Sequence, residues 1–230
     1  MFYFKGTRKP NFENISQNIY DNFWDNKTDK FRSKLMDREY IFIDWIKPNS
    51  RVLSIGCGNS RLLLDLKNKK NCDVYGVDIA ESIVNLLKTN NIPAKKTDVT
   101  SFGFENDEFF AKKFDYIVMS ELLEHLVLPE KIARSLADKT DYFVISLPNS
   151  AFYRYRIGLM FKGRFFTQWA CHPSEHLRYW SYIDFLDWLK ALNFNIIEFK
   201  SSNGPFLKNI WPNMFGNQIC YLVKTGLSFR

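Results

Sequence analysis

Residues 51–60, which read RVLSIGCGNS, decide the fold class. A short apolar run ends at Gly56, and a segment with helical spacing follows over residues 60–69. This pattern predicts a strand, a tight turn and a helix. The glycines Gly56 and Gly58 allow a ligand to approach the backbone closely at the start of the helix, where N–H groups have no partner within the helix.

The same alternation continues along the chain. Further strands are predicted at residues 73–78, 94–99, 114–120, 141–147, 194–199 and 218–224, and helices at 80–90, 129–139 and 182–192. Short connections and apolar strands predict an α/β fold with a Rossmann-like, seven-stranded, mostly parallel sheet, helices on both faces and an antiparallel last strand. Such sheets bind ligands at the carboxyl ends of their strands.

Length and composition predict a single domain over residues 1–230. Hydrophobic residues make up 46% of the chain and charged residues 25%, which excludes disordered and collagen-like proteins. We expect an N-terminal helical cap at residues 1–50 and a substrate-binding insertion at residues 149–180, after the fifth strand. No apolar run reaches the ~18 residues of a membrane span. Four cysteines without paired spacing and the lack of a signal-peptide pattern predict a cytoplasmic protein.

An acidic residue, Asp78, ends the second predicted strand, twenty residues after Gly58. A carboxylate at this distance can accept hydrogen bonds from both hydroxyls of a ribose. The third glycine of a dinucleotide-binding turn is missing, because Arg61 stands there, and the chain has no phosphate-binding loop. NAD and nucleoside triphosphates are therefore disfavoured, and S-adenosylmethionine is the remaining common nucleoside cofactor.

In order and spacing, the chain resembles the class I S-adenosylmethionine-dependent methyltransferases. The matching segments are VLSIGCGNS, VYGVDIA, KTDVT and FDYIVMSELLEHL. A closer likeness to the MetW-like and UbiG-like branches lies in SELLEHLVLPEK, SLPN, YRYRIGLMFKGR and EHLRYWSYIDFLDWL. The family usually has an acid where this chain has Ser54, at a position thought to steady the amino end of the cofactor.

The resemblance also implies which residues bind S-adenosylmethionine and its product S-adenosylhomocysteine. The implied contacts are Gly56, Cys57 and Gly58 around the methionine part, Asp78 at the ribose with Ile79 beside it, Asp98 and Val99 at the adenine, and Ser120 and Glu121 beside the sulfonium.

All three histidines fall where a ligand is expected. Methyl transfer to oxygen needs an oriented acceptor and a base whose pKa lies near neutrality. His125, after the fourth strand, is the first candidate for this base and His176 the second, while packing roles and catalysis by positioning alone are the alternatives. Cys171, His172 and His176 have side chains that bind metals, but no fourth ligand is apparent, so we expect no metal site.

The insertion is basic and aromatic. Its candidates for substrate binding are Arg154, Arg156, Arg164, Arg178 and Tyr179. Arginine binds phosphate and carboxylate groups in a bidentate manner, whereas arginines lying on aromatic faces of a solvated lid are the alternative. The net charge of +7 permits a nucleic acid, but no separate RNA-binding module is present, so a small anionic molecule is favoured. Tyr20, Phe23 and Trp24 are expected either to close over the cofactor or to pack in a helix.

These observations predict a methyltransferase that acts on a small anionic acceptor, most readily at oxygen. The Asn/Asp-Pro-Pro-Tyr loop typical of amino-group methylation is absent after the fourth strand. A phosphorylated sugar or nucleotide precursor of a surface glycan would satisfy this description. The alternatives are a MetW-like regulatory partner of a biosynthetic acyltransferase, with little catalysis of its own, and an RNA methyltransferase. A protein partner or a homodimer is compatible with these readings.

Overall fold

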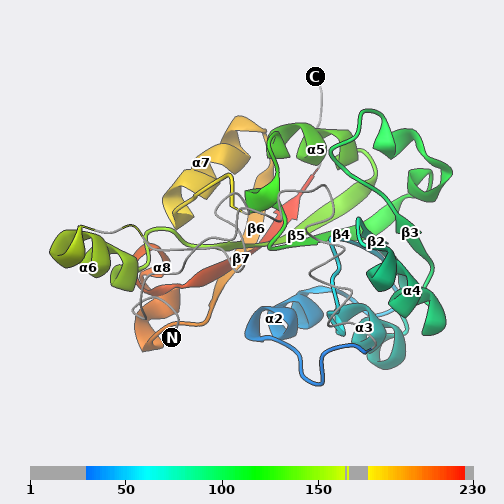
Figure 1. Cartoon of the computed structure of the whole chain (residues 1–230), viewed down its shortest axis with the longest axis horizontal. Coiled ribbons are helices and arrows are strands. Elements are labelled where there is room, and N and C mark those ends of the chain that lie inside the picture. The colour runs from blue at the N-terminus through cyan, green and yellow to red at the C-terminus, as the bar shows by residue number, and fades with distance from the viewer. Residues whose placement is uncertain (1–29, 164, 166–175, 226–230) are drawn as a thin grey trace, which may run out of the picture.

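A computed structural model describes residues 30–163, 165 and 176–225 (Figure 1). Its strands are β1 (Arg51–Ile55), β2 (Asp73–Asp78), β3 (Ala94–Lys96), β4 (Phe114–Ser120), β5 (Thr140–Pro148), β6 (Asn195–Ser202) and β7 (Gln218–Lys224). They form one 7-stranded sheet in the order β3-β2-β1-β4-β5-β7-β6. The first five strands pair in parallel, and β7 is antiparallel to both of its neighbours. The predicted fold class is confirmed.

Helices cover both faces of the sheet (Figure 1). One face carries α2 (Asp37–Trp45), α3 (Leu62–Lys70) and α4 (Glu81–Thr89), and the other carries α5 (Pro129–Leu136) and α7 (Tyr182–Ala191). Two further helices, α6 (Tyr153–Lys162) and α8 (Pro212–Phe215), lie beside each other. The short 3-10 helices are η1 (Phe104–Asn106), η2 (Glu108–Phe110), η3 (Leu123–His125) and η5 (Phe206–Asn209).

The core has two layers because successive strand residues point to opposite faces. In β1, Val52 packs in the layer under α2, α3 and α4, whereas Leu53 and Ile55 pack in the layer under α5 and α7. Residues 52–55 are therefore all buried, as expected of a central parallel strand covered on both sides. This rigid centre holds the turn after β1 in place.

Several element boundaries differ from the sequence expectation. The strand predicted at residues 94–99 ends at Lys96, because Asp98 Oδ1 accepts hydrogen bonds from the backbone N and Oγ1 of Thr100, which turns the chain. The last two strands, β6 and β7, pair antiparallel, but η5 and α8 lie between them in the chain, so they do not form a tight hairpin.

The two predicted additions are described in part. Residues 30–50 of the expected N-terminal cap contain α2, and the insertion contains α6. Tyr20, Phe23 and Trp24 lie outside the described residues. Within the described part of the chain, no helix is long and apolar enough to cross a bilayer.

Candidate functional site

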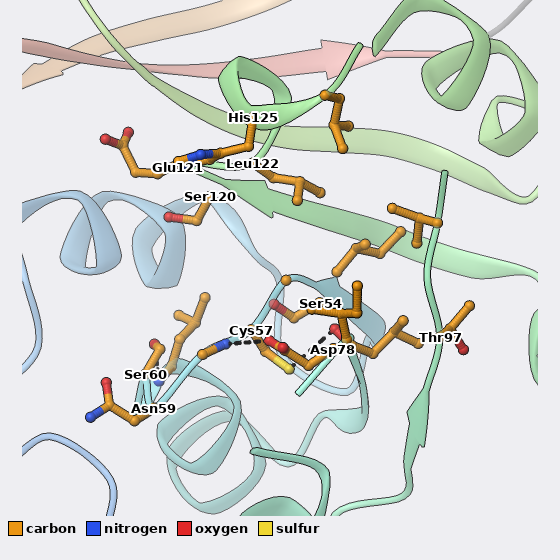
Figure 2. A pocket seen from close by; sticks show the side chains of 18 of the residues that line it. Ser54, Cys57, Asn59, Ser60, Asp78, Thr97, Ser120, Glu121, Leu122 and His125 are labelled. Atoms are coloured by element: carbon orange, nitrogen blue, oxygen red, sulfur yellow. Dashed lines mark hydrogen bonds between the residues drawn. The ribbon is translucent and has the colours of Figure 1, made fainter. Parts of the chain in front are cut away.

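A cavity of about 490 Å³ opens beyond the carboxyl ends of β1, β2 and β4 (Figure 2). This volume lies within the range of small-molecule sites. The cavity brings together every residue predicted to bind the cofactor, and the first candidate base: Gly56, Cys57, Gly58, Asp78, Ile79, Asp98, Val99, Ser120, Glu121 and His125. Residues from four separate loops thus meet at one edge of the sheet, as the strand order requires.

The glycine turn places backbone against the cavity. Gly56 and Gly58 have φ of 64° and 50°, in the left-handed region that favours glycine. A Cβ atom on Gly56 would lie 3.0 Å from Leu122 Cδ1. The thiol of Cys57 is buried and donates to the Val77 carbonyl at 3.4 Å. Burial raises the pKa of this thiol, so Cys57 contributes structure rather than a nucleophile.

The carboxylate of Asp78 is fixed in orientation (Figure 2). The backbone N–H of Gly58 donates to Oδ2 at 2.9 Å, and that of Ala80 donates to Oδ1 at 3.0 Å. The residue is only 5% exposed, yet it lines the cavity. A carboxylate offers about four acceptor positions, which is more than these two backbone hydrogen bonds use.

The loop after β4 forms the opposite end of the site. Glu121 has φ of 52°, a strained conformation for a residue with a side chain, which its surroundings hold in place. Ser146 Oγ donates to its Oε1 at 3.0 Å, and Gln218 Nε2 donates to Oε2 at 2.9 Å. Beside it, Ser120 Oγ accepts a hydrogen bond of 2.9 Å from Arg38 Nε. Side chains from β5, β7 and α2 therefore fix the two predicted residues.

Helix α2 and the residues before it supply a wall of the cavity that the sequence reasoning missed. Arg32, Met36, Arg38 and Glu39 all line it. Glu39 is buried and accepts hydrogen bonds from Ser60 Oγ at 2.6 Å and from the Met36 backbone N–H at 2.7 Å, as well as from Arg32. No motif marks these residues, because only the packing of α2 against the sheet brings them to the turn.

The two candidate bases lie next to each other. His125 ends η3 and lines the cavity, and its ring centroid is 4.6 Å from that of His176. His125 Nε2 lies 4.0 Å from Oε1 of the buried Glu124. Burial, and secondly the charge of Glu121, raise the pKa of the Glu124 carboxyl well above its usual value. Cys171 and His172 lie outside the described residues.

Four of the predicted substrate-binding residues of the insertion lie in the described part of the chain, and none of these four lines this cavity. Arg154 Nε donates to the Tyr153 hydroxyl at 3.1 Å, and Arg156 Nε donates to the Ala151 carbonyl at 2.5 Å. Arg178 donates to the Val127 carbonyl, and Tyr179 is exposed. Arg164 lies outside the described residues. Arg32 and Arg38 are the arginines that the described part of the chain does place in the cavity wall.

The family described as "Methionine biosynthesis protein MetW" matches residues 36–223, which span the sheet up to the next-to-last residue of β7. The chain belongs to the MetW family. This finding confirms the closer of the two likenesses seen in the sequence, and the matched range includes every lining residue of the cavity except Arg32.

Curated relatives match this MetW-family chain over part of their length. It is 26% identical over 180 residues to the bifunctional methionine biosynthesis protein MetXA/MetW of Rhodopirellula baltica, covering 71% of this chain and 28% of that protein. It is 29% identical over 131 residues to a ubiquinone biosynthesis O-methyltransferase of Neisseria meningitidis serogroup C, covering 52% of this chain and 53% of that protein. It is 34% identical over 120 residues to N-methyltransferase 4 of Papaver somniferum, covering 46% of this chain and 33% of that protein. The chain thus spans about half or less of each of these relatives.

Solved structures share the fold of the MetW-family chain. A S-adenosylmethionine-dependent methyltransferase from Archaeoglobus fulgidus superposes with a TM-score of 0.59 and 20% identity, covering 90% of this chain and 99% of that one. A putative methyltransferase in complex with the Haloferax volcanii Trm112 activator gives a TM-score of 0.59 and 10% identity, covering 84% and 90%.

Proposed function

We propose that this chain is an S-adenosylmethionine-dependent methyltransferase that methylates a small anionic acceptor at oxygen. The observation that carries the proposal is the Asp78 carboxylate, fixed by two backbone N–H groups in the wall of a cavity of about 490 Å³. The relatives named as methyltransferases and the shared fold support the same activity.

The residues of the cavity fit the cofactor. Asp78 is suited to accept the ribose hydroxyls, and the turn at Gly56 and Gly58 leaves backbone rather than side chains beside the methionine part. Val99 and Ile79 supply apolar surface for an adenine ring. Within this proposal, Asp98 contacts the adenine edge.

The loop after β4 would receive the acceptor. When bound, S-adenosylmethionine supplies a methyl group on a cationic sulfur, so that a C–O bond forms as the C–S bond breaks, sulfur keeps the electron pair and the acceptor hydroxyl loses its proton. His125 lines this end and is the proposed base for that proton, with His176 beside it. Ser120 and Glu121 would position the reacting groups.

Arg38, whose Nε donates to Ser120 Oγ at the β4 end of the cavity, favours an anionic acceptor there, for example a phosphorylated sugar; Arg32 is paired with Glu39. Arg32 and Arg38 line the cavity itself. We propose that the basic insertion adds further anion contacts once an acceptor is bound, through Arg154, Arg156, Arg164, Arg178 and Tyr179. Guanidinium groups suit this task because they bind phosphate and carboxylate in a bidentate manner.

Calorimetric titration of the purified chain with S-adenosylmethionine and S-adenosylhomocysteine tests the proposal. Before titration, cofactor carried through purification is assayed and removed. We expect one site per chain with micromolar or tighter affinity, which corresponds to a binding free energy of about −8 kcal/mol or a more negative value. Failure of both compounds to bind would contradict the methyltransferase assignment.

A second candidate is a binding partner that regulates a biosynthetic acyltransferase with little catalysis of its own. Ser54, buried in the cavity wall where an acid is usual, favours this function, as does the relative named MetXA/MetW. Co-purification with an acyltransferase, together with no methyl transfer to any small acceptor, is the result expected of it. Turnover by the isolated chain would exclude it.

A further inference from the structure

Three side chains with metal-binding atoms converge at the His125 end of the cavity. One atom each from Glu124, His125 and His176 lies within 4.8 Å of the other two. Ligand atoms held about 2.0–2.2 Å from one ion lie within about 4.4 Å of each other. Small side-chain rotations would therefore bring all three into coordination.

Backbone hydrogen bonds between residues 53 and 54 positions apart in the sequence hold this cluster together. The N–H groups of Leu177 and Arg178 donate to the carbonyl of Glu124 at 2.8 and 3.1 Å. The Arg178 side chain donates to the Val127 carbonyl on the other side of η3. This pairing places the His176 ring against that of His125, with an angle of 88° between their planes.

Glu124 gives the independent reason to expect a cation. Its side chain is 2% exposed, and neither carboxylate oxygen has a hydrogen-bond partner within the described residues. His125 Nε2 is 4.0 Å from Oε1, which is too far for a hydrogen bond. A buried carboxylate without a partner is costly, whereas a bound cation would neutralise it.

We infer that Glu124, His125 and His176 bind one divalent transition-metal ion at the His125 end of the cavity. Two imidazoles and one carboxylate suit Fe²⁺, Mn²⁺ and Zn²⁺, and they leave coordination positions open for an exchangeable ligand. No metal site was expected from the sequence, because the local pattern groups His176 only with Cys171 and His172. The sequence does not mark Glu124 as a ligand, because its proximity to His176 depends on the fold.

The consequence for catalysis rests on the proposed function. An open coordination position would take an acceptor oxygen, and a bound cation lowers the pKa of a coordinated hydroxyl. His125 would then act as a ligand in place of the base proposed above, and the proton of the coordinated hydroxyl would leave to solvent water before its oxygen takes the methyl group. The acceptors expected are anionic molecules whose hydroxyl lies next to a second oxygen, since two neighbouring oxygens can chelate one ion.

Metal titration of the full chain tests the inference. The protein is stripped with EDTA, dialysed, and titrated with Mn²⁺ by calorimetry and with Co²⁺ by visible absorption. We expect one ion per chain, and nitrogen couplings from two histidines in pulsed electron paramagnetic resonance of the Mn²⁺ form. Glu124→Gln and His176→Ala should each weaken Mn²⁺ binding at least tenfold and should leave the affinity for S-adenosylmethionine unchanged.

The matched control is Glu130→Gln, which removes a carboxylate on α5 outside the cluster and should bind Mn²⁺ like the parent chain. Thermal unfolding of each variant shows whether it is folded. Absence of saturable Mn²⁺ or Co²⁺ binding, or equal binding by folded Glu124→Gln and His176→Ala variants, would overturn the metal site. Because cofactor binding is measured separately, either result leaves the proposed function standing, and failure to bind S-adenosylmethionine would leave the metal result standing.

Discussion

Replacing Asp78 with alanine is expected to weaken the binding of S-adenosylmethionine by a factor of at least ~100, because two hydroxyls lose a charged acceptor worth about 1.5–3 kcal/mol each. The substitution also removes the acceptor that fixes the N–H groups of Gly58 and Ala80, so the turn loses part of its preorganisation. Asp78→Asn keeps one acceptor oxygen and should give an intermediate loss. Calorimetric titration of each variant measures the effect.

Asp73→Ala is the matched control. Asp73 begins the same strand, β2, at the end opposite Asp78, and it pairs with Arg51 on the surface. An exposed pair contributes little, so stability should change by less than about 1 kcal/mol and cofactor affinity should not change. Circular dichroism verifies that the Asp78 variants are folded. A folded Asp78→Ala chain with the parent affinity would show that this carboxylate does not hold the cofactor.

Replacing Gly76 with valine is expected to give the largest loss of stability. Gly76 lies inside β2, between β1 and β3, where α4 packs against the strand. A Cβ atom there would lie 2.4 Å from Leu87 Cδ1 and 3.3 Å from Cys57 Sγ, and both of these side chains are buried. Overpacking of this kind costs about 1–3 kcal/mol and distorts the neighbouring backbone. The free energy of unfolding, measured by urea denaturation, should fall toward the upper end of that range.

Gly158→Ala is the control, because this glycine substitution should raise the free energy of unfolding rather than lower it. Gly158 lies within α6, and a Cβ atom there would meet nothing within 4 Å. Alanine in a helix interior is about 0.5–1 kcal/mol more favourable than glycine, so this variant should be slightly more stable. If Gly76→Val and Gly158→Ala shifted the unfolding midpoint equally, the side chains around Gly76 in β2 would not be packed as tightly as described.

The fold and the cofactor end of the site are predictable from local sequence. The strand, turn and helix around Gly56 follow from a short apolar run and two glycines, and Asp78 follows from its place at the end of the next strand. These residues lie within one strand–helix–strand unit, so the side chains that shape the cofactor end are close in sequence to the turn they form. All nine residues inferred for the cofactor accordingly line one cavity.

The rest of the site depends on contacts between distant segments. Arg38 reaches Ser120, 82 positions away, only because α2 packs beside the sheet. Glu124 meets His176 only because the chain returns from the insertion along η3. The arginine-rich pattern of the insertion predicts a substrate contact, but it did not predict that Arg154 would donate to the Tyr153 hydroxyl and Arg156 to the Ala151 and Asn213 carbonyls. Periodicity and spacing carry no information about such pairings.

A crystal structure of the chain grown with S-adenosylhomocysteine shows whether this cavity holds the nucleoside. We expect the nucleoside in the cavity beyond β1, β2 and β4, with both ribose hydroxyls within hydrogen-bond distance of Asp78 and the adenine beside Val99. A ligand bound elsewhere on the chain, or an empty cavity in crystals grown with saturating ligand, would contradict it.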